Sequence, residues 1–584
     1  MEKRAIIAIV LSILVLLLYQ KFFIKEQPRK SGERKAAERV EPMPPAPKLS
    51  EDKAEGASRE SAVGIGEGRP GTGEVAGDKR RMLRDVSVET KLYSATFSNY
   101  GGTLKSWRLH RYKNRVEYGQ FVRWFQETEN KVRKHLPFLG ERPVAEGRPE
   151  PVELVTTATR ETLPLAIEVY DEKGRIDFAP MDVDHEGISL GGNVREGTLL
   201  FRGISPGGLE LSRGYRFSDD TYWVDMEVRI KNRDARAKEL RVGLVWFGKM
   251  LGADSRAFSG PVAMVDGQVQ EIKEKKFRKE ELSLSGDITW FGDASCGENV
   301  PKGERKPFFL SLVVPKESEG IKLGIGMKDE RVVYSRGVHP ARSISEGAEA
   351  VYTYQFYLGP KVIDFLKELN VGAEKVIRYG WFTPIAKVLL LFINFTHKIT
   401  KNYGADIIII SVLLKILFWP LTRKSYVSMK EMQKVQPEMA MLREKYKDDK
   451  TRLNREMMDL YKRRKVNPLG GCLPMVVQIP VFFALYWALM GSIELRHAPF
   501  ILWIGDLSYR DPIYVSPILM GASMVWQQKM TPAVGDPRQA KMMMIMPIVF
   551  TFLFLSFPSG LVIYWLVTNI LTIGQQYLIN KMRK

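Results

Sequence analysis

The sequence predicts a polytopic α-helical membrane protein that carries a large β-sandwich domain outside the bilayer. Two observations support this fold class. The C-terminal third contains long uncharged runs, and residues 542–580 include no charged side chain. Residues 85–360 instead alternate between apolar and polar side chains, which is typical of half-buried strands.

The N-terminus predicts a single membrane anchor followed by a linker. Residues 5–20 are uncharged and follow Lys3 and Arg4, as in a signal peptide. Because no small-x-small cleavage site follows, we expect residues 1–27 to remain as a transmembrane anchor. Residues 28–84 are rich in Pro, Gly and charged side chains, so we expect a disordered linker.

Residues 85–360 predict one extracytoplasmic β domain. In one segment Tyr222, Val224 and Met226 alternate with Trp223 and Asp225, and turn signals such as glycine pairs separate such runs. The size suits a large β-sandwich. A sugar-binding role is an alternative, but we find no motif of paired carboxylates in its favour.

Residues 361–403 predict amphipathic helices at the membrane interface. One helix is expected over 361–378, with Val362, Phe365 and Leu366 on a shared face. Residues 381–399 are more apolar but contain Lys387, so we expect a helix lying on the membrane, with a span as the alternative.

Residues 404–580 predict a core of five spans, six with the anchor. The expected spans are 404–421, 469–490, 512–528, 542–556 and 560–579. The 542–556 span would be only about 22 Å long at 1.5 Å per residue, short enough to thin the local bilayer. Residues 581–584 form a short basic tail.

The loops predict the orientation. The loop 422–467 contains fourteen Lys or Arg residues, whereas 492–511 contains two. Because basic loops stay in the cytoplasm, both termini are expected there and the β domain outside, in the periplasm of a two-membrane bacterium. Residues 423–466 also show apolar side chains at three- and four-residue spacing, which predicts a basic helical hairpin that either packs on itself or docks a partner.

Lys415 is the most informative single residue. It lies in the apolar run 407–415, where a lysine facing lipid would cost about 2.5–3.5 kcal/mol. One interpretation is that its amine extends to the cytoplasmic surface. The other is that Lys415 and Ser411, one turn apart, face a hydrophilic pocket among the helices. Gln478, Tyr564 and several further polar residues of the spans favour the pocket, although polar residues also join helices to each other.

The composition argues against several other classes. A formal net charge of +20 suits an anionic membrane surface better than nucleic acid here, because the charges flank apolar spans. The two cysteines, Cys296 and Cys472, do not suggest a disulfide framework. Glu494 and His497 lack a second histidine, so we expect no metal site.

Three motifs resemble one known family. Residues 467–474 read Asn-Pro-Leu-Gly-Gly-Cys-Leu-Pro and resemble the signature that opens the third span in the YidC family of membrane protein insertases. Residues 557–561 (Phe-Pro-Ser-Gly-Leu) and 494–496 (Glu-Leu-Arg) match it too. The resemblance extends over nearly the whole chain and is most specific in the core.

The resemblance implies an insertase and chaperone rather than an enzyme. It implies a hydrophilic groove open to the cytoplasm and lipid, no cofactor, and a β-supersandwich periplasmic domain similar to sugar mutarotases. Nascent membrane proteins would be the substrates. Sec translocon subunits, the ribosome and the signal recognition machinery would be the partners, alongside the lipid bilayer. The residues matching substrate-contacting positions are Lys415, Ser411, Phe482, Met520, Leu553, Tyr564 and Trp565.

Two features depart from the family pattern. The groove cation is usually arginine, and lysine at 415 lacks the guanidinium fork that holds a carboxylate in two places. The C-terminal tail is shorter than the basic ribosome-binding tail of some relatives. A transporter and an envelope enzyme are the competing classes; the first would show internal repeats, which we do not find.

Overall fold

The computed structural model describes residues 83–134, 148–157, 159–178, 180–250, 258–295, 297, 299–300, 307–464, 466, 473–530 and 537–581. The expected anchor (1–27), nearly all of the expected linker (28–84) and the start of the 467–474 motif lie outside these residues. So do the last three residues of the tail.

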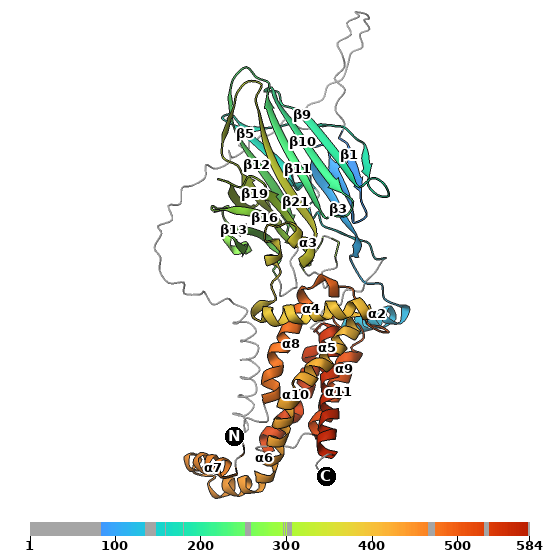
Figure 1. The fold of residues 1–584 in the computed structure, drawn as a ribbon, viewed down its shortest axis with the longest axis vertical. Coiled ribbons are helices and arrows are strands. Elements are labelled where there is room, and N and C mark those ends of the chain that lie inside the picture. Colours follow the sequence, from blue (N-terminus) through green and yellow to red (C-terminus); the bar gives the residue numbers. More distant parts are fainter. Residues whose placement is uncertain are drawn as a thin grey trace, which may run out of the picture. The chain divides into compact units, whose positions relative to one another are not determined.

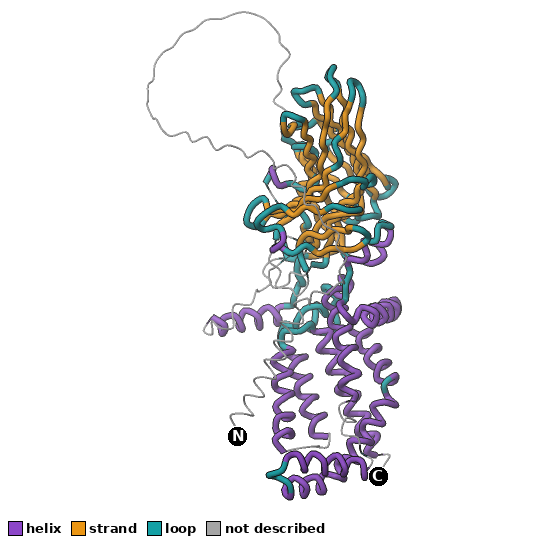
Figure 2. Tube along the Cα trace, turned by 90° about the vertical axis from the view of Figure 1, so that its left-hand side faces the viewer, coloured by secondary structure: helices purple, strands orange, loops and turns teal. Residues whose placement is uncertain are grey.

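The described residues between Asp85 and Pro360 are mainly strands (Figures 1 and 2). Their pairing forms three sheets. A five-stranded sheet has the order β4 (Pro151–Glu153), β3 (Thr103–Lys113), β2 (Tyr93–Ser98), β1 (Asp85–Glu89), β8 (Gly187–Ser189). A nine-stranded sheet has the order β14 (Gln268–Glu271), β13 (Gly260–Val265), β16 (Ile288–Ser295), β17 (Phe309–Pro315), β21 (Glu349–Pro360), β11 (Trp223–Asn232), β10 (Leu209–Ser218), β9 (Glu196–Ile204), β7 (Asp182–Val183).

The third sheet has seven strands. Six follow the order β15 (Leu282–Leu284), β18 (Lys322–Met327), β19 (Val332–Val338), β12 (Lys238–Lys249), β5 (Ala166–Asp171), β6 (Gly174–Ile176), and β20 (Arg342–Ile344) pairs with β12. The period-two pattern explains the central strands. In β11, Val224, Met226 and Val228 are buried, and Met226 pairs with Tyr354 of the antiparallel neighbour β21. One face of such a strand thus supplies the core of the domain, whereas β13 and β17 are buried on both faces.

Two short helices accompany the β domain. Helix α2 (Gln120–Lys134) lies between β3 and β4 in the sequence. Helix α3 (Ile363–Glu368) replaces the long helix expected over 361–378. That helix stops because Asn370 and Gly372 both adopt positive φ, and Leu366 and Leu369 pack into the β core rather than onto a membrane.

The described residues from Thr383 onward are mainly helical (Figure 1). Its helices are α4 (Thr383–Thr400), α5 (Tyr403–Leu417), α6 (Trp419–Lys445), α7 (Lys450–Arg464), α8 (Leu473–Gly491), α9 (Val515–Met530), α10 (Pro537–Phe554) and α11 (Ser559–Lys581). Helix α11 packs against α5, α8 and α9, α10 packs against α9, and α4 packs against α5 and α8.

Two helices differ in extent from the sequence prediction. The expected span 404–421 is interrupted by a 60° bend between α5 and α6. Pro420 sits in the first turn of α6, where a proline is well tolerated and a new helix readily starts. Helix α10 begins at Pro537, earlier than expected, but its first residues include Arg538 and Lys541, and its apolar part is Met544–Phe554, about 16 Å long at 1.5 Å per residue.

The helical hairpin expected over 423–466 is present as α6 and α7. Met432, Val435, Met439 and Leu460 are buried between its two arms. The methionine-rich seam therefore packs within the hairpin, as the self-contained alternative expected.

Apolar side chains are exposed on α5, α9, α10 and α11. Exposed examples are Ile416, Leu417, Ile518, Phe552 and Ile570. By length and composition, α11 alone among the described helices can cross a bilayer, and α5 with α6 adds a second if both arms form one span. Residues Val477–Gly491 and Met544–Phe554 are shorter apolar stretches.

Candidate functional site

The side chain of Lys415 turns inward from α5. Its Nζ donates a hydrogen bond to Thr572 Oγ1 of α11 over 2.8 Å. The next two residues, Ile416 and Leu417, are instead 61% and 66% exposed. The helix therefore presents apolar side chains outward and its lysine toward the neighbouring helix, so the amine does not reach out along the helix surface.

Lys415 lines a pocket of about 400 Å³, a volume that includes the part open to the outside. Four helices contribute to the lining. The ten lining residues are Ser411, Leu414, Lys415, Phe418, Leu421, Thr422, Val477, Gln478, Tyr564 and Thr568. Lys415 is the one charged residue among these ten, so an anion entering the pocket meets a cation without a competing carboxylate in the lining.

The polar lining is partly tied up in bonds between helices. Gln478 Nε2 of α8 donates to Tyr564 Oη of α11 over 2.7 Å, and Gln575 Nε2 of α11 donates to Thr422 Oγ1 of α6 over 2.8 Å. These bonds hold the walls together. Polar residues of this region thus join helices to each other as well as line the pocket.

An aromatic cluster lies beside Tyr564 in the sequence. The rings of Phe482 in α8 and Trp565 in α11 meet edge to face, with centroids 5.2 Å apart. Phe554 of α10 lies 5.5 Å from Trp565 and 5.9 Å from Phe482. The aromatic rings thus form an apolar contact between α8, α10 and α11. None of these three residues lines the pocket.

The predicted site residues therefore fall into three groups. Ser411, Lys415 and Tyr564 share the pocket. Phe482 and Trp565 meet in the aromatic cluster. Met520 is fully buried in α9 and Leu553 is 39% exposed on α10, so neither lines the pocket.

The sequence did not identify the pocket residues that lie at the bend between α5 and α6. Phe418, Leu421 and Thr422 enter the pocket lining because α5 turns by 60° into α6. Thr422 was expected at the start of the cytoplasmic loop. The signal was Pro420, which marks a helix start inside an apolar run.

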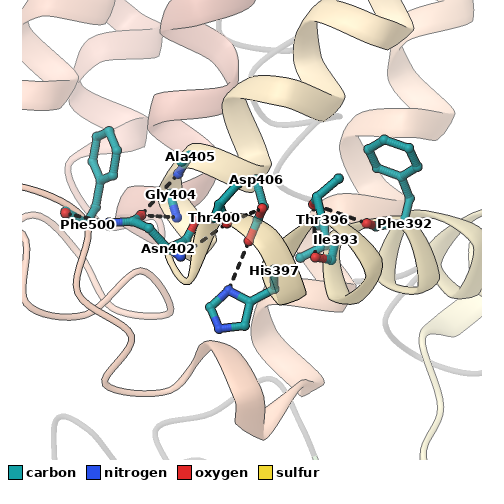
Figure 3. A network of polar contacts seen from close by, with 10 residues as sticks. All are labelled: Phe392, Ile393, Thr396, His397, Thr400, Asn402, Gly404, Ala405, Asp406 and Phe500. Atoms are coloured by element: carbon teal, nitrogen blue, oxygen red, sulfur yellow. Dashed lines mark hydrogen bonds and ion pairs between the residues drawn. The ribbon is translucent and has the colours of Figure 1, made fainter.

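A polar corner fixes the beginning of α5 (Figure 3). Asp406 is completely buried and accepts hydrogen bonds from Thr400 Oγ1 at 2.7 Å and His397 Nδ1 at 3.0 Å. Asn402 caps α5 by accepting from the backbone N–H groups of Gly404 and Ala405.

The same corner binds a neighbouring loop. Asn402 Nδ2 donates to the carbonyl oxygen of Phe500 over 2.9 Å, and the His397 ring stacks on Tyr403 with centroids 3.6 Å apart. Because α5 carries Ser411 and Lys415, this corner sets where both side chains enter the pocket. Within the described residues, no group of three or more His, Cys, Asp or Glu side chains could hold a metal ion.

Two family models match the chain, one mostly over the β domain and the other over the helices that follow it. The YidC periplasmic domain matches residues 143–392, and the 60Kd inner membrane protein matches residues 395–584. Proteins named membrane protein insertase YidC are also 38% and 39% identical to it over its full length. The chain belongs to the YidC family. It is therefore an inner-membrane protein with a periplasmic domain.

Relatives in this family match the full length of the chain. A membrane protein insertase YidC from Syntrophus aciditrophicus is 39% identical over 100% of both chains. One from Geotalea daltonii is 38% identical over 100% of this chain and 99% of its own. A solved structure of an active YidC insertase with its first transmembrane domain resolved is 16% identical, covers 85% of this chain and 93% of its own, and has a TM-score of 0.36.

Proposed function

We propose that this YidC family member inserts hydrophobic segments of nascent membrane proteins into the inner membrane and helps them fold. The supporting observation is the position of Lys415, which lines a polar pocket within a bundle whose outer surface is apolar. Such a pocket gives the polar end of an incoming chain a place below the headgroups, where it would otherwise lose its hydration.

The proposed mechanism has two stages. The Lys415 ammonium first attracts an acidic extracytoplasmic segment into the pocket, which opens toward the cytoplasm and lipid and stays closed to the periplasm. The apolar segment that follows then slides along the third and fifth spans (469–490 and 542–556) into lipid. Burial of apolar groups drives this step, at about 0.8 kcal/mol per CH₂, so neither a cofactor nor enzymatic chemistry is required.

The aromatic cluster would contact the apolar segment as that segment moves from the pocket into lipid. Phe482 and Trp565 connect α8 with α11, and Phe554 extends the cluster to α10. Leu553 lies next to it in sequence and is partly exposed, as a residue facing the departing segment would be. Met520, which is fully buried, would support the wall rather than touch the substrate.

The same proposal includes the finer topology. The apolar runs support six spans. The basic loops support an orientation with both termini in the cytoplasm and residues 85–360 in the periplasm. The periplasmic domain would be a β-supersandwich. The basic hairpin α6–α7 and the other cytoplasmic loops would face the ribosome and signal recognition machinery, and the protein would work alone or with the Sec translocon.

Site-specific crosslinking tests the insertase mechanism. A photoreactive residue at Phe482 or Ser411 should crosslink to a stalled nascent membrane protein. The matched control is Ile518, which is 58% exposed on the outer face of α9 and away from the pocket lining. Equal crosslinking from all three positions would mean that the segment does not follow the pocket and the aromatic cluster.

A further inference from the structure

Helix α2 of the β domain exposes an apolar stripe. Phe121 and Trp124 are 61% and 59% exposed, their ring centroids lie 6.1 Å apart, and Val132 is 55% exposed. At about 100° per residue these positions and Thr128 share one side of the helix. Large aromatic side chains grouped in this way on a surface indicate contact with another apolar phase.

Of the other two sides of α2, one is exposed and charged and the other is buried. Arg123 and Glu127 are exposed, and Arg123 lies about 160° around the helix from Phe121. Val122 and Gln126 are buried, and Val122 packs with Ile513. The helix therefore has a docked side, a charged side and an exposed apolar side.

The docked side is attached to the beginning of a membrane helix. Tyr514 Oη donates to Glu129 Oε1 over 2.7 Å, and Arg133 Nη2 donates to the same Tyr514 oxygen over 3.3 Å. Helix α9 starts at the next residue, Val515. Its outward apolar surface begins with Ile518, 58% exposed and about one helical turn beyond Tyr514.

We propose that α2 lies in the periplasmic face of the bilayer and inserts Phe121, Trp124 and Val132 among the lipid headgroups. Its attachment to Tyr514 brings α2 to the beginning of α9, a helix whose exposed residues, such as Ile518, are apolar. Tryptophan and phenylalanine on one side of a helix, with charged residues on the other, suit the interface. The helix carries four basic and two acidic residues, which favours anionic lipids.

This contact would tie the β domain to the membrane independently of the chain connection at residues 361–403. It concerns a segment outside the pocket and does not depend on the insertion mechanism. The occupant is the lipid surface; a protein partner on the same stripe is the competing outcome.

Lipid-quenching measurements on the full chain test the proposal. With Cys296 and Cys472 replaced by serine, single cysteines at Thr128→Cys and Arg123→Cys would carry an environment-sensitive fluorophore in phosphatidylethanolamine–phosphatidylglycerol vesicles. Thr128 shares the apolar side and leaves both aromatic residues in place. We expect lipids with a nitroxide near the headgroup to quench the label at 128 at least about twofold more than the label at 123, and aqueous iodide to do the reverse.

A second variant separates the aromatic residues from the helix itself. Phe121→Ser with Trp124→Ser, in the Thr128→Cys background, should lower the nitroxide quenching toward the value at 123 while the thermal unfolding temperature stays unchanged. Equal iodide quenching at 128 and 123, with no added effect of nitroxide lipid at 128, would overturn the proposal. So would full nitroxide quenching at 128 after both aromatic residues are removed.

Discussion

At the scale of single residues, the proposed mechanism depends on the positive charge of Lys415. Its amine donates a hydrogen bond to Thr572 of α11, which holds it among the helices, and the residue lines the pocket. A lysine keeps a compact charge with three donors but cannot grip a carboxylate with two parallel bonds, as arginine does. The positive charge at position 415, rather than the two parallel hydrogen bonds of a guanidinium group, should therefore determine how the pocket attracts a carboxylate.

Reversing that charge should impair only part of the substrate range. At an effective dielectric constant of about 20, a charge pair 4 Å apart is worth about 4 kcal/mol, and about 1.4 kcal/mol changes a rate tenfold. We expect Lys415→Glu to slow insertion of substrates with acidic translocated segments at least about tenfold, while Lys415→Arg inserts them normally. Protease protection in reconstituted vesicles measures this.

A substrate with a neutral translocated segment is the internal control. It should insert at a similar rate with either variant. Normal insertion of the acidic substrate by Lys415→Glu would remove the electrostatic stage of the mechanism.

His339 gives the β domain a pH-dependent stability. It is 3% exposed, its Nε2 lies 2.8 Å from Tyr354 Oη, and burial, with Arg342 nearby, lowers its pKa to about 4. The unfolded chain, with a histidine pKa of about 6.5, thus binds more protons than the folded chain between these values. Stability is complete above pH about 6.5 and falls as the pH drops toward 4.

The size of this effect can be read from thermal or denaturant unfolding. We expect the free energy of unfolding to be about 2 kcal/mol lower at pH about 5 than at pH about 7 through this group. His339→Gln should reduce that difference. An unchanged pH dependence in the variant would assign the effect to other groups.

At the scale of elements, the corner between α4 and α5 positions the pocket. Asp406 accepts two side-chain hydrogen bonds while completely buried. Asp406→Ala leaves Thr400 and His397 without this acceptor, which costs about 1–3 kcal/mol for a buried polar group. We expect a lower unfolding temperature in detergent and reduced insertion.

Lys398→Ala is a suitable control, because Lys398 lies on the same helix as His397 but is exposed. Lys398→Ala should leave both the unfolding temperature and the insertion activity unchanged. If Asp406→Ala behaves like Lys398→Ala, the corner does not hold α5 in place.

The elements also show how far the sequence could be interpreted. The alternation of Val224, Met226 and Val228 predicted a strand correctly because a half-buried strand imposes a period of two on its own residues. Lys415 was singled out because an ion in an apolar run is costly, but the run left open whether its amine reaches the surface or a pocket. Local pattern was sufficient for the strand and identified the lysine without deciding its direction.

Local pattern failed where distant packing decides. The 361–378 segment has an amphipathic face, yet the β core takes up Leu366 and Leu369 and the helix ends at Glu368. Thr422 enters the pocket only because the chain bends between α5 and α6. The bonds from Asn402 to Phe500 and from Gln575 to Thr422 join residues far apart in the sequence, which periodicity does not detect.

At the scale of the whole molecule, charge asymmetry predicts the orientation. The 422–467 loop holds fourteen basic and seven acidic residues, whereas the 492–511 loop holds two basic residues. Since translocating many basic residues is unfavourable, the hairpin α6–α7 should stay in the cytoplasm and the β domain should cross the membrane.

Cysteine labelling of intact cells tests this orientation with two exposed, polar positions. In a chain with Cys296 and Cys472 replaced by serine, Ser343→Cys lies on β20 and Thr451→Cys lies on α7. A maleimide small enough to pass the outer membrane but unable to cross the inner membrane should label position 343 directly. It should label position 451 only after the inner membrane is permeabilised. Labelling of 451 in intact cells would invert the topology, and the pocket around Lys415 would then open to the periplasm, where it could not receive a chain emerging from the ribosome.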